Sequence, residues 1–430
     1  MKNTFLFLLS VVVMSLSSCS EDRDDGPYRE YLVAIPLTTN LAQFKEEAVA
    51  VTEPVPMIDS GKIYAYKNYI FVNDVNRGFH VIDNSDPTAP QNIAFIKLEG
   101  NNDISVKNNI LFADSYGDLV VFDISDAHNI SLSDRIENAI YDNGWGVWAT
   151  DLEAPQADFY DYGDYDYQTE AVIGWEVRTE RRLVSEYENR YFGFYEDSGF
   201  LNSTSTANAS PTQTIGQGGS LARFKIVDDY LYVVDYSDIN IFDISDLEDP
   251  KVLEDVEVGW DIETIFNQGD ILFLGGRQGM YIYDITEPSK PTFVSEFRHG
   301  TACDPVVVDG NFAYVTLRSG NFCGGTESGL YVVDITNLTD PELKVIYPMD
   351  EPYGIGIKGY KLFVCDGNAG LKVYDTTDAP NLSQLNHFPE IFAYDVIPLE
   401  NSLLMIGEKV LYQYEYIENN IRLLSAFDLK

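Results

Sequence analysis

Short runs of apolar and β-branched residues that end in an aspartate recur along the chain. The clearest is "LYVVDIT" at 330–336. The aspartates of the six clear runs are Asp83, Asp123, Asp243, Asp284, Asp334 and Asp375. Most neighbouring copies lie about 40 residues apart, and a degraded seventh copy, "LYQYEY", occupies 411–416. A fixed period of this length indicates one structural unit repeated seven times.

Each unit divides into four short runs of β-type residues. In the fifth unit these runs are "CDPVVVDG", "NFAYVTL", "GLYVVDIT" and "PELKVIYPM", and turn-forming residues separate them. Such runs predict β-strands joined by tight turns. A repeated four-stranded antiparallel sheet is typical of a propeller blade, because one blade alone cannot bury both of its faces. We therefore expect an all-β fold: a seven-bladed β-propeller of four-stranded antiparallel blades over residues 46–430.

The repeated aspartates close the third strand of each unit and usually precede a hydroxyl residue by two positions. A carboxylate there can accept hydrogen bonds from backbone N–H groups of the following turn, so we interpret these residues as structural. The copies "LYVVDIT" and "LVVFDIS" (119–125) resemble the LVIVD repeat of bacterial secreted and lipid-anchored proteins, which is taken to build β-propellers. The resemblance implies the fold and leaves the function open, since propellers serve as enzymes, binders and scaffolds.

The N-terminus has the pattern of a bacterial lipoprotein. Residues 1–18 combine a lysine with an apolar stretch too short for a permanent anchor, which predicts a signal peptide. "LSSC" ends at Cys19 and resembles a lipobox, which implies that Cys19 is lipidated. An acidic tether is expected over residues 19–45. We expect attachment to the outer membrane through this lipid alone, with display at the cell surface favoured over a periplasm-facing position.

The charge of the chain restricts its partners. It has 28 Lys and Arg against 69 Asp and Glu, for a formal net charge of −41. Such a surface repels phosphate backbones, so no nucleic-acid partner is expected and a neutral, cationic or metal-bridged partner is favoured. The 45% hydrophobic content is ample for a packed core. The expected oligomeric state is a monomer.

Two segments interrupt the repeat. Residues 142–219 separate the second and third units, and residues 318–328 lengthen the fifth unit. The longer segment joins a fourth strand to the next first strand, and the shorter one joins a second strand to a third. In a propeller, these two kinds of connection emerge on the same face. Aromatic rings beside carboxylates in the longer insertion suit adaptable recognition of a ligand, and a solvated loop without a ligand is the alternative. The aromatic candidates are Trp145, Trp148, Tyr160, Tyr162, Tyr165 and Tyr167.

Two sets of carboxylates are further candidates. Asp158, Asp161, Asp164 and Asp166 could hold Ca²⁺, although their spacing lacks the EF-hand pattern, and no other cofactor or metal site is assigned. The second set lies at the predicted starts of first strands, around the mouth of the central channel: Asp103, Glu263, Asp304 and Asp395. A ring of carboxylates can bind a cation or a polyhydroxyl ligand, and a merely hydrated channel mouth is the alternative.

These features favour a non-catalytic binding or scaffold module that engages a protein or a glycan through its inserted face. The alternative is a glycan hydrolase or lyase that uses two mouth carboxylates as acid and base. The sequence lacks a Ser–His–Asp order and a phosphate-binding loop, so no catalytic residue is assigned and binding is favoured over catalysis.

The remaining cysteines are Cys303, Cys323 and Cys365. In an oxidising compartment an odd number implies one pair and one free thiol. Cys303 precedes a first strand and Cys323 lies in a second-to-third connection of the same unit, so both are expected on one face. We predict a disulfide between Cys303 and Cys323 and a buried thiol at Cys365.

Overall fold

The computed structural model describes residues 28–141, 146–183, 214–259, 262–300, 305–318, 328–418 and 420–430. Nearly all regular structure in these ranges is β-strand, and α2 (Leu41–Glu47) is their one helix. No helix in this part of the chain has the length and apolar character of a membrane span. The described residues divide into two compact units, and the larger unit contains all of the repeats.

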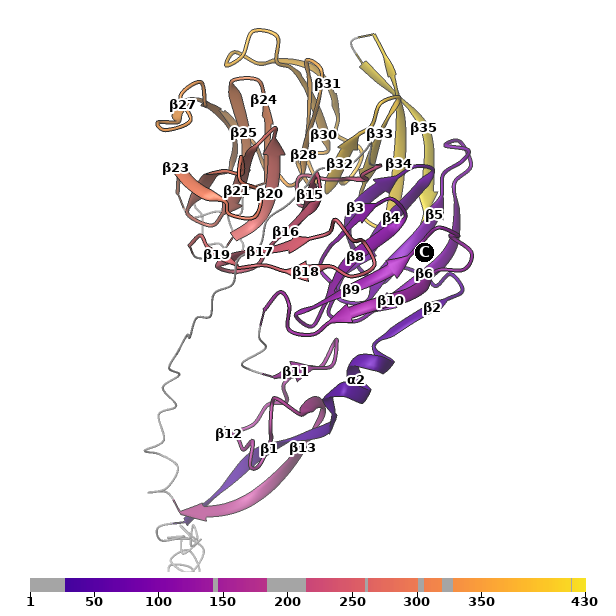
Figure 1. The fold of residues 1–430 in the computed structure, drawn as a ribbon, viewed down its shortest axis with the longest axis vertical. Helices are drawn as coiled ribbons and strands as arrows, with labels where there is room; N and C mark the ends of the chain where they lie inside the picture. The colour runs from indigo at the N-terminus through magenta and orange to yellow at the C-terminus, as the bar shows by residue number, and fades with distance from the viewer. Residues whose placement is uncertain are drawn as a thin grey trace, which may run out of the picture. The chain divides into compact units, whose positions relative to one another are not determined.

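The repeats form seven antiparallel sheets built on four strands each, which confirms the predicted seven-bladed β-propeller (Figure 1). From the channel outward, the first blade consists of β3 (Ser60–Tyr66), β4 (Tyr69–Asp74), β5 (Gly78–Asp83) and β6 (Gln91–Leu98), and the second of β7 (Ile104–Lys107), β8 (Ile110–Ser115), β9 (Asp118–Asp123) and β10 (Ser131–Ile136). The third consists of β15 (Phe224–Val227), β16 (Tyr230–Val234) and β17 (Asp238–Asp243), and its outer edge is formed by β18 (Lys251–Val252) and β19 (Val256–Glu257), which both pair with β17.

The remaining four blades follow the same plan, with the first strand innermost. The fourth blade consists of β20 (Ile262–Gln268), β21 (Ile271–Gly276), β22 (Gly279–Asp284) and β23 (Thr292–Arg298), and the fifth of β24 (Val306–Asp309), β25 (Phe312–Leu317), β26 (Gly329–Asp334) and β27 (Glu342–Pro348). The sixth consists of β28 (Ile355–Lys358), β29 (Lys361–Cys365), β30 (Leu371–Asp375) and β31 (Ser383–Phe388), and the seventh of β32 (Asp395–Pro398), β33 (Ser402–Ile406), β34 (Val410–Ile417) and β35 (Asn420–Asp428).

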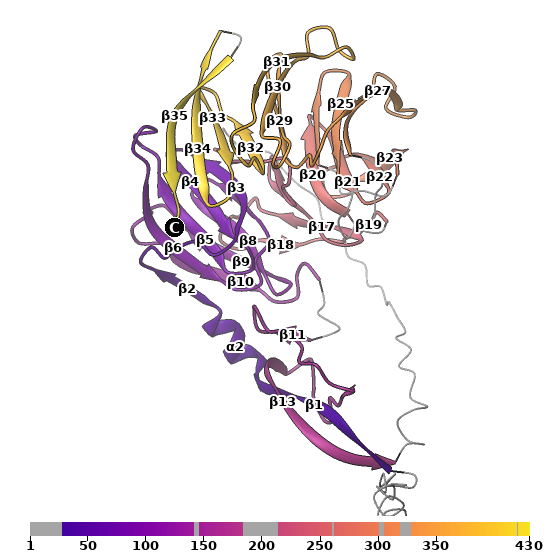
Figure 2. The same ribbon diagram turned by 180° about the vertical axis from the view of Figure 1, so that it is seen from behind.

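The ring closes between the first and the last blade. Each innermost strand contacts the innermost strand of the next blade, and β32 of the last blade contacts β3 of the first. Figure 2 shows the yellow C-terminal blade beside the indigo first blade. The C-terminal strand β35 completes the last blade, whereas β2 (Val49–Thr52) pairs with β6 outside the first blade. No strand is exchanged between the terminal blades of the described chain, so side-chain packing and individual hydrogen bonds, such as that from the Met57 N–H to the Leu429 carbonyl, close the ring.

The hydrophobic core lies between neighbouring blades. In β9 the successive residues Leu119, Val120, Val121 and Phe122 are all fully buried. Val120 and Phe122 pack in a cluster with residues of the first blade, and Leu119 and Val121 pack in a cluster with residues of the third. Because both faces of a blade are covered, its inner strands are continuous apolar runs instead of alternating ones.

The repeated aspartates have the structural role predicted for them. In six blades the Oδ1 atom accepts a hydrogen bond from the backbone N–H two residues later, at 2.7–2.9 Å, in the pairs Asp83–Ser85, Asp123–Ser125, Asp243–Ser245, Asp284–Thr286, Asp334–Thr336 and Asp375–Thr377. Hydrogen bonds from Ser85 hold the pKa of Asp83 below its usual value. These carboxylates fix the turn into the fourth strand and are dispersed over the rim, so they form no common site.

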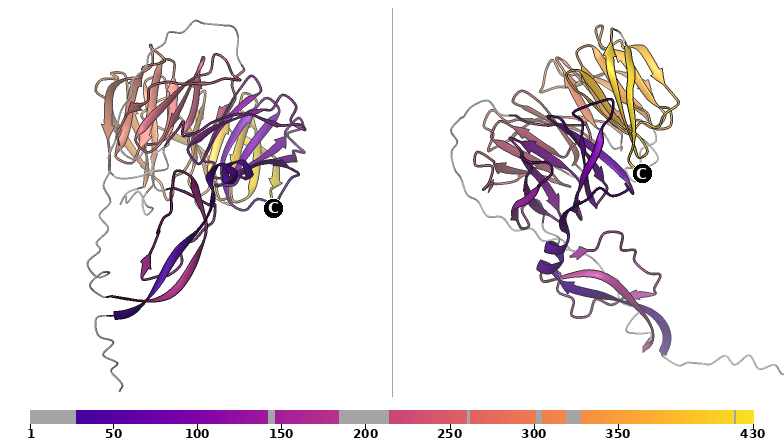
Figure 3. Two further views of the ribbon diagram at one scale, coloured as in Figure 1. Left: turned by 60° about the horizontal axis from the view of Figure 1, so that its bottom comes forward. Right: turned by 90° about the vertical axis from the view of Figure 1, so that its right-hand side faces the viewer.

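The smaller unit is a sheet of long strands (Figure 3). It contains most of β1 (Tyr28–Asn40) and β13 (Glu170–Leu183), together with β12 (Phe159–Tyr160). β1 and β12 pair in parallel, with Val33 opposite Phe159, and Val33 is fully buried. The expected tether over residues 19–45 is therefore wrong from residue 28 onward, because β1 pairs with β12 and β13 of the insertion and buries Val33 and Ala34.

Helix α2 is also firmly placed, within the larger unit. Its N-cap residue Asn40 accepts a hydrogen bond from the backbone N–H of Gln43 at 3.0 Å. Lys45 forms an ion pair of 2.6 Å with Asp118 of β9, and both side chains are buried. Nearby, β11 (Val147–Trp148) contributes Val147 to a small apolar cluster against which Leu41 and Phe44 of the helix pack. Residues 39–48 are thus part of the folded body.

Candidate functional site

A cavity of about 390 Å³ opens at the mouth of the central channel. It lies where the first strands begin and the second strands end, because its lining residues precede or start first strands or follow second strands. Each blade contributes at least one lining residue, and examples in blade order are Lys62, Asn102, Arg223, Glu263, Pro305, Tyr353 and Tyr394. This is the propeller face on which the sequence places both insertions.

Basic residues outnumber acidic ones at this cavity. Lys62, Arg223 and Arg318 line it, and Glu263 is the one acidic residue among the described lining residues. The whole chain has the opposite balance, with 28 basic and 69 acidic residues. The cavity is therefore a local exception to a strongly negative protein.

Arg318 lies over the ring of an aromatic side chain. Its guanidinium carbon is 4.0 Å from the centre of the Tyr353 ring, and the Tyr353 ring contacts that of Tyr394 at 5.2 Å between centres. The carbonyl of Tyr353 accepts a hydrogen bond from the Thr316 hydroxyl at 2.8 Å, which fixes the backbone beneath the ring. A stacked guanidinium keeps its N–H donors at its edges, where a ligand can reach them.

Asp103 ties three blades together just below the cavity. One of its carboxylate oxygens accepts hydrogen bonds from the backbone N–H groups of Arg223 and Phe224, and the other accepts from Ile104 at 2.8 Å. The ammonium group of Lys62 lies 3.5 Å from the same carboxylate. Burial lowers the pKa of Lys62, and the charge of Asp103 acts in the opposite direction. Asp103 thus links the first strands of three neighbouring blades at the channel mouth.

A second set of aspartates, which sequence reasoning missed, positions the segments that enter the first strands. Asp114 accepts hydrogen bonds from the backbone N–H groups of Asn102 and Asp103, both at 2.9 Å. Asp74 does the same for Ile58 and Asp59, and Asp366 for Asp350 and Glu351. The available signal was an aspartate at or near the end of the second strand: Asp74, Asp114 and Asp366. Asp235 has the same position in the third blade but accepts backbone hydrogen bonds from Ser237 and Asp238 of the following turn.

Asp395, the first residue of β32, is sealed inside the protein. It is 0% exposed, and its Oδ1 accepts a hydrogen bond from the backbone N–H of Val396 at 2.9 Å. Its Oδ2 has no hydrogen-bond partner among the described residues. Backbone of Gly219 and Gly354 closes over the carboxylate, since a Cβ at either position would lie 2.5 Å or less from a carboxylate oxygen. Burial raises the pKa of Asp395 to about 7.

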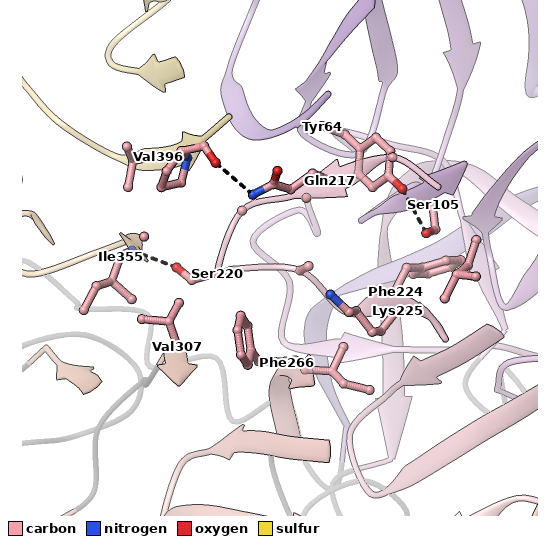
Figure 4. A pocket seen from close by; sticks show the side chains of 18 of the residues that line it. Tyr64, Ser105, Gln217, Ser220, Phe224, Lys225, Phe266, Val307, Ile355 and Val396 are labelled. Atoms are coloured by element: carbon pink, nitrogen blue, oxygen red, sulfur yellow. Dashed lines mark hydrogen bonds between the residues drawn. The ribbon is translucent and has the colours of Figure 1, made fainter. Parts of the chain in front are cut away.

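The last part of the insertion runs through the channel itself, which the sequence did not indicate. Residues 214–220 enter beside the end of β7 and include β14 (Gln217–Gly218), which pairs antiparallel with β3. The Gln217 side chain donates to the carbonyl of Pro398, and the Ser220 hydroxyl accepts from the backbone N–H of Ile355 (Figure 4). A cavity of about 190 Å³ remains beside this segment. The channel is thus partly filled by the chain.

The predicted carboxylate ring is only partly exposed to the cavity. Asp103 directly precedes β7, Glu263 is the second residue of β20 and Asp395 begins β32, but only Glu263 of these three lines the cavity. Asp304 lies outside the described residues. Sequence reasoning missed the three basic residues because nothing in the repeat marks Lys62, Arg223 or Arg318, and only the ring brings them together.

The aromatic candidates of the insertion are divided between the two units. In the smaller unit Tyr160 and Tyr162 contact Trp175 edge-on, at 5.5 Å and 5.9 Å between ring centres, and Tyr165 lies beside Tyr162. Trp175, which was not a candidate, is the centre of this cluster. Trp148 and Tyr167 belong to the larger unit. Trp145 lies outside the described residues.

Two of the proposed calcium ligands have other partners. Asp158 accepts a hydrogen bond from the backbone N–H of Leu32 at 2.7 Å, and Asp161 forms an ion pair of 2.9 Å with Arg182. In the described chain no group of three or more carboxylate, histidine or cysteine side chains is arranged to hold a metal ion. Asp158 and Asp161 therefore stabilise the smaller unit.

The cysteine predictions have different outcomes. Cys365 is a free, fully buried thiol, as predicted, and burial raises its pKa. Cys19, Cys303 and Cys323 lie outside the described residues. The disulfide between Cys303 and Cys323 stays a prediction.

Comparison with protein families identifies the repeat. The LVIVD repeat matches residues 59–94, 101–137, 218–257 and 299–348. Each match covers all or most of one of the blades described above. The chain is thus a β-propeller that contains four matches to the LVIVD repeat. No curated protein matches it.

Several solved structures align with this chain at low identity and with TM-scores below 0.5. The computationally designed Ika8 protein is 12% identical with a TM-score of 0.46, and the alignment covers 88% of this chain and 90% of that one. A functionally unknown protein from Desulfotomaculum acetoxidans is 13% identical with a TM-score of 0.46, at 84% and 96% coverage. PorZ, a surface component of the type-IX secretion system of Porphyromonas gingivalis, is 13% identical with a TM-score of 0.45, at 87% and 39% coverage. The fold assignment rests on the blades and not on these likenesses.

Proposed function

We propose that this propeller is a non-catalytic binding module of the cell envelope, which holds a protein or glycan ligand at the mouth of its central channel. The observation that carries the proposal is the cavity of about 390 Å³ lined by residues of all seven blades. Its volume is in the range of ligand-binding pockets, and rigid first strands position its walls. A site built in this way needs no movement of the blades to accept a ligand.

The hydrogen bonding and burial of the carboxylates at the channel mouth favour ligand binding over catalysis. A glycosidase needs two accessible carboxyl groups on either side of the scissile bond. Here Asp103 accepts backbone hydrogen bonds from two blades, and Asp395 is enclosed by the backbone of Gly219 and Gly354. Glu263 alone among the described mouth carboxylates lines the cavity. A single carboxylate beside basic and aromatic residues suits recognition of a ligand.

Blocking the cavity with a large side chain at its rim is expected to abolish ligand binding. Val75 lines the cavity and is 37% exposed, so Val75→Trp places an indole at the opening without disturbing the core. Binding is measured on a glycan array and by pull-down from cell-envelope extract. Wild type is expected to retain a ligand, and Val75→Trp is expected to lose at least 90% of the signal.

A matched control separates a blocked site from a damaged fold. Val252 lies in β18 at the outer part of the third blade and is 51% exposed, so Val252→Trp adds the same ring far from the channel. Both variants should unfold at the wild-type temperature, and Val252→Trp should bind like wild type. Equal binding by the two variants would show that the ligand uses another surface.

The proposed location is the outer membrane, with the protein held at the cell surface by a lipid on Cys19. The support is the signal-like segment and the lipobox-like "LSSC" before that residue. Metabolic labelling with a fatty acid should mark the wild type and leave Cys19→Ser unlabelled. Protease added to intact cells should remove the wild type from the surface, and full protection in intact cells would instead indicate a periplasm-facing anchor.

A further inference from the structure

We propose that the ligand at the channel mouth is an acidic sugar, whose carboxylate is held by Arg318 and Arg223. This inference rests on the proposed binding function and names the chemical class of the ligand. It depends on three features of the cavity: unpaired guanidinium groups, a low net charge and tyrosine rings at its wall and rim.

The two arginines are available to an anion. Arg318 stacks on Tyr353 at 4.0 Å, and the Nε of Arg223 donates to the carbonyl of Val234 at 3.2 Å. Neither guanidinium forms an ion pair within the part of the chain that the structure describes. In a protein with 69 acidic residues, two arginines without a carboxylate partner in one cavity are exceptional. The edge of a guanidinium binds a carboxylate through paired hydrogen bonds, and the contact with the Tyr353 ring restricts the movement of Arg318.

The charge around the cavity suits one negative charge better than two. Lys62, Arg223 and Arg318 line it, with Glu263 beside them and Asp103 next to Lys62. Among the described residues of the mouth, the charge of Asp103 offsets that of Lys62, and the buried Asp114 also acts on Lys62 and Arg223. The excess of positive charge over these residues is therefore small, which fits a single carboxylate better than a phosphate dianion or a polyphosphate.

The rest of the cavity suits a sugar ring. Tyrosine rings offer apolar faces for stacking and hydroxyl groups for hydrogen bonds. Tyr353 and Tyr394 form one wall, and Tyr236 lines the opening with 73% of its surface exposed. The volume of about 390 Å³ accommodates one or two sugar units. A longer acidic peptide would have to carry further negative charges across a surface that repels them.

Pairs of methyl glycosides that differ only at C6 test the proposal directly. The probes are methyl glucuronide against methyl glucoside and methyl galacturonide against methyl galactoside, titrated into the full chain by ligand-observed NMR and calorimetry. We expect at least one acidic member to bind about 10-fold or more tightly than its neutral partner. Arg318→Gln and Arg223→Gln should each remove about 10-fold of that affinity, and Arg318→Lys should retain the charge and lose part of the affinity.

The control arginine is Arg298, which is exposed and paired with Glu296, so Arg298→Gln should leave the affinities unchanged. Thermal unfolding reports whether the cavity variants are folded. Equal affinity for both members of each pair, or unchanged affinity in Arg318→Gln, would overturn the proposal. Binding of a neutral glycan or an acidic peptide that Val75→Trp abolishes would also overturn it, while leaving the proposed binding function intact.

Discussion

Asp395→Asn is expected to raise the free energy of unfolding by about 4 kcal/mol at pH 8 and to change it little near pH 4. Burial raises the pKa of Asp395 from 3.8 to about 7. Between these two values the folded protein holds a proton that the unfolded chain releases, so wild-type stability falls as the pH rises. Asparagine is neutral at every pH, so Asp395→Asn does not lose stability in this way. Denaturant unfolding of both proteins at pH 4.5, 6 and 8 measures the difference in their free energies of unfolding.

Asp103→Asn is the matched control with the opposite sign. Asp103 accepts backbone hydrogen bonds from Ile104, Arg223 and Phe224 and lies beside Lys62, so the folded structure stabilises its negative charge. Its neutralisation should lower the free energy of unfolding by about 2 kcal/mol at pH 8. If the free energies of unfolding of wild type and Asp395→Asn differed by the same amount at all three pH values, Asp395 would not be protonated in the folded protein.

Gly219→Ala is expected to destabilise the protein by about 3 kcal/mol, the upper part of the range for overpacked cores. A Cβ at residue 219 would lie 2.2 Å from Oδ2 and 2.6 Å from Cγ of Asp395. The carboxylate cannot move away freely, because its other oxygen is also enclosed: a Cβ built at Gly354 would lie 2.5 Å from Oδ1. Denaturant unfolding at pH 6 reports the change.

The cause is tested by removing the obstructing group. In the background of Asp395→Ala the same Gly219→Ala change should cost about 1 kcal/mol or less, so the two substitutions should be strongly coupled. Gly300→Ala is the neutral control, because no described atom lies within 4 Å of a Cβ built there. Additive effects of the two substitutions would contradict the close packing of residues 214–220 against β32.

The repeat was sufficient to predict the blades because each blade is a local structure. Its four strands are consecutive, its turns are short, and an aspartate such as Asp123 fixes a turn through the residue two positions later. The apolar runs identified the strands without showing which blade each face contacts. Val120 and Val121 are neighbours in sequence but pack against different blades.

The N-terminal segment shows where local reasoning failed. Residues 28–40 follow an acidic stretch and stand outside the repeat, a pattern that predicts a tether. In the structure they form β1, whose partner β12 is more than a hundred residues away in the insertion. Pairing between segments so distant in sequence leaves no periodic signal in either segment, since each is short or irregular by itself.

The sequence by itself determined the repeat, the strand order within each blade, the role of the turn aspartates and the face that carries the insertions. These follow from contacts between residues close in the chain. Only the tertiary structure decided that residues 214–220 occupy the channel, that Asp395 is enclosed by two glycines, and that Arg223 and Arg318 meet at one cavity. The physical reason is ring closure: it brings the starts of seven first strands around one axis, and their chemistry depends on neighbours that no local pattern records.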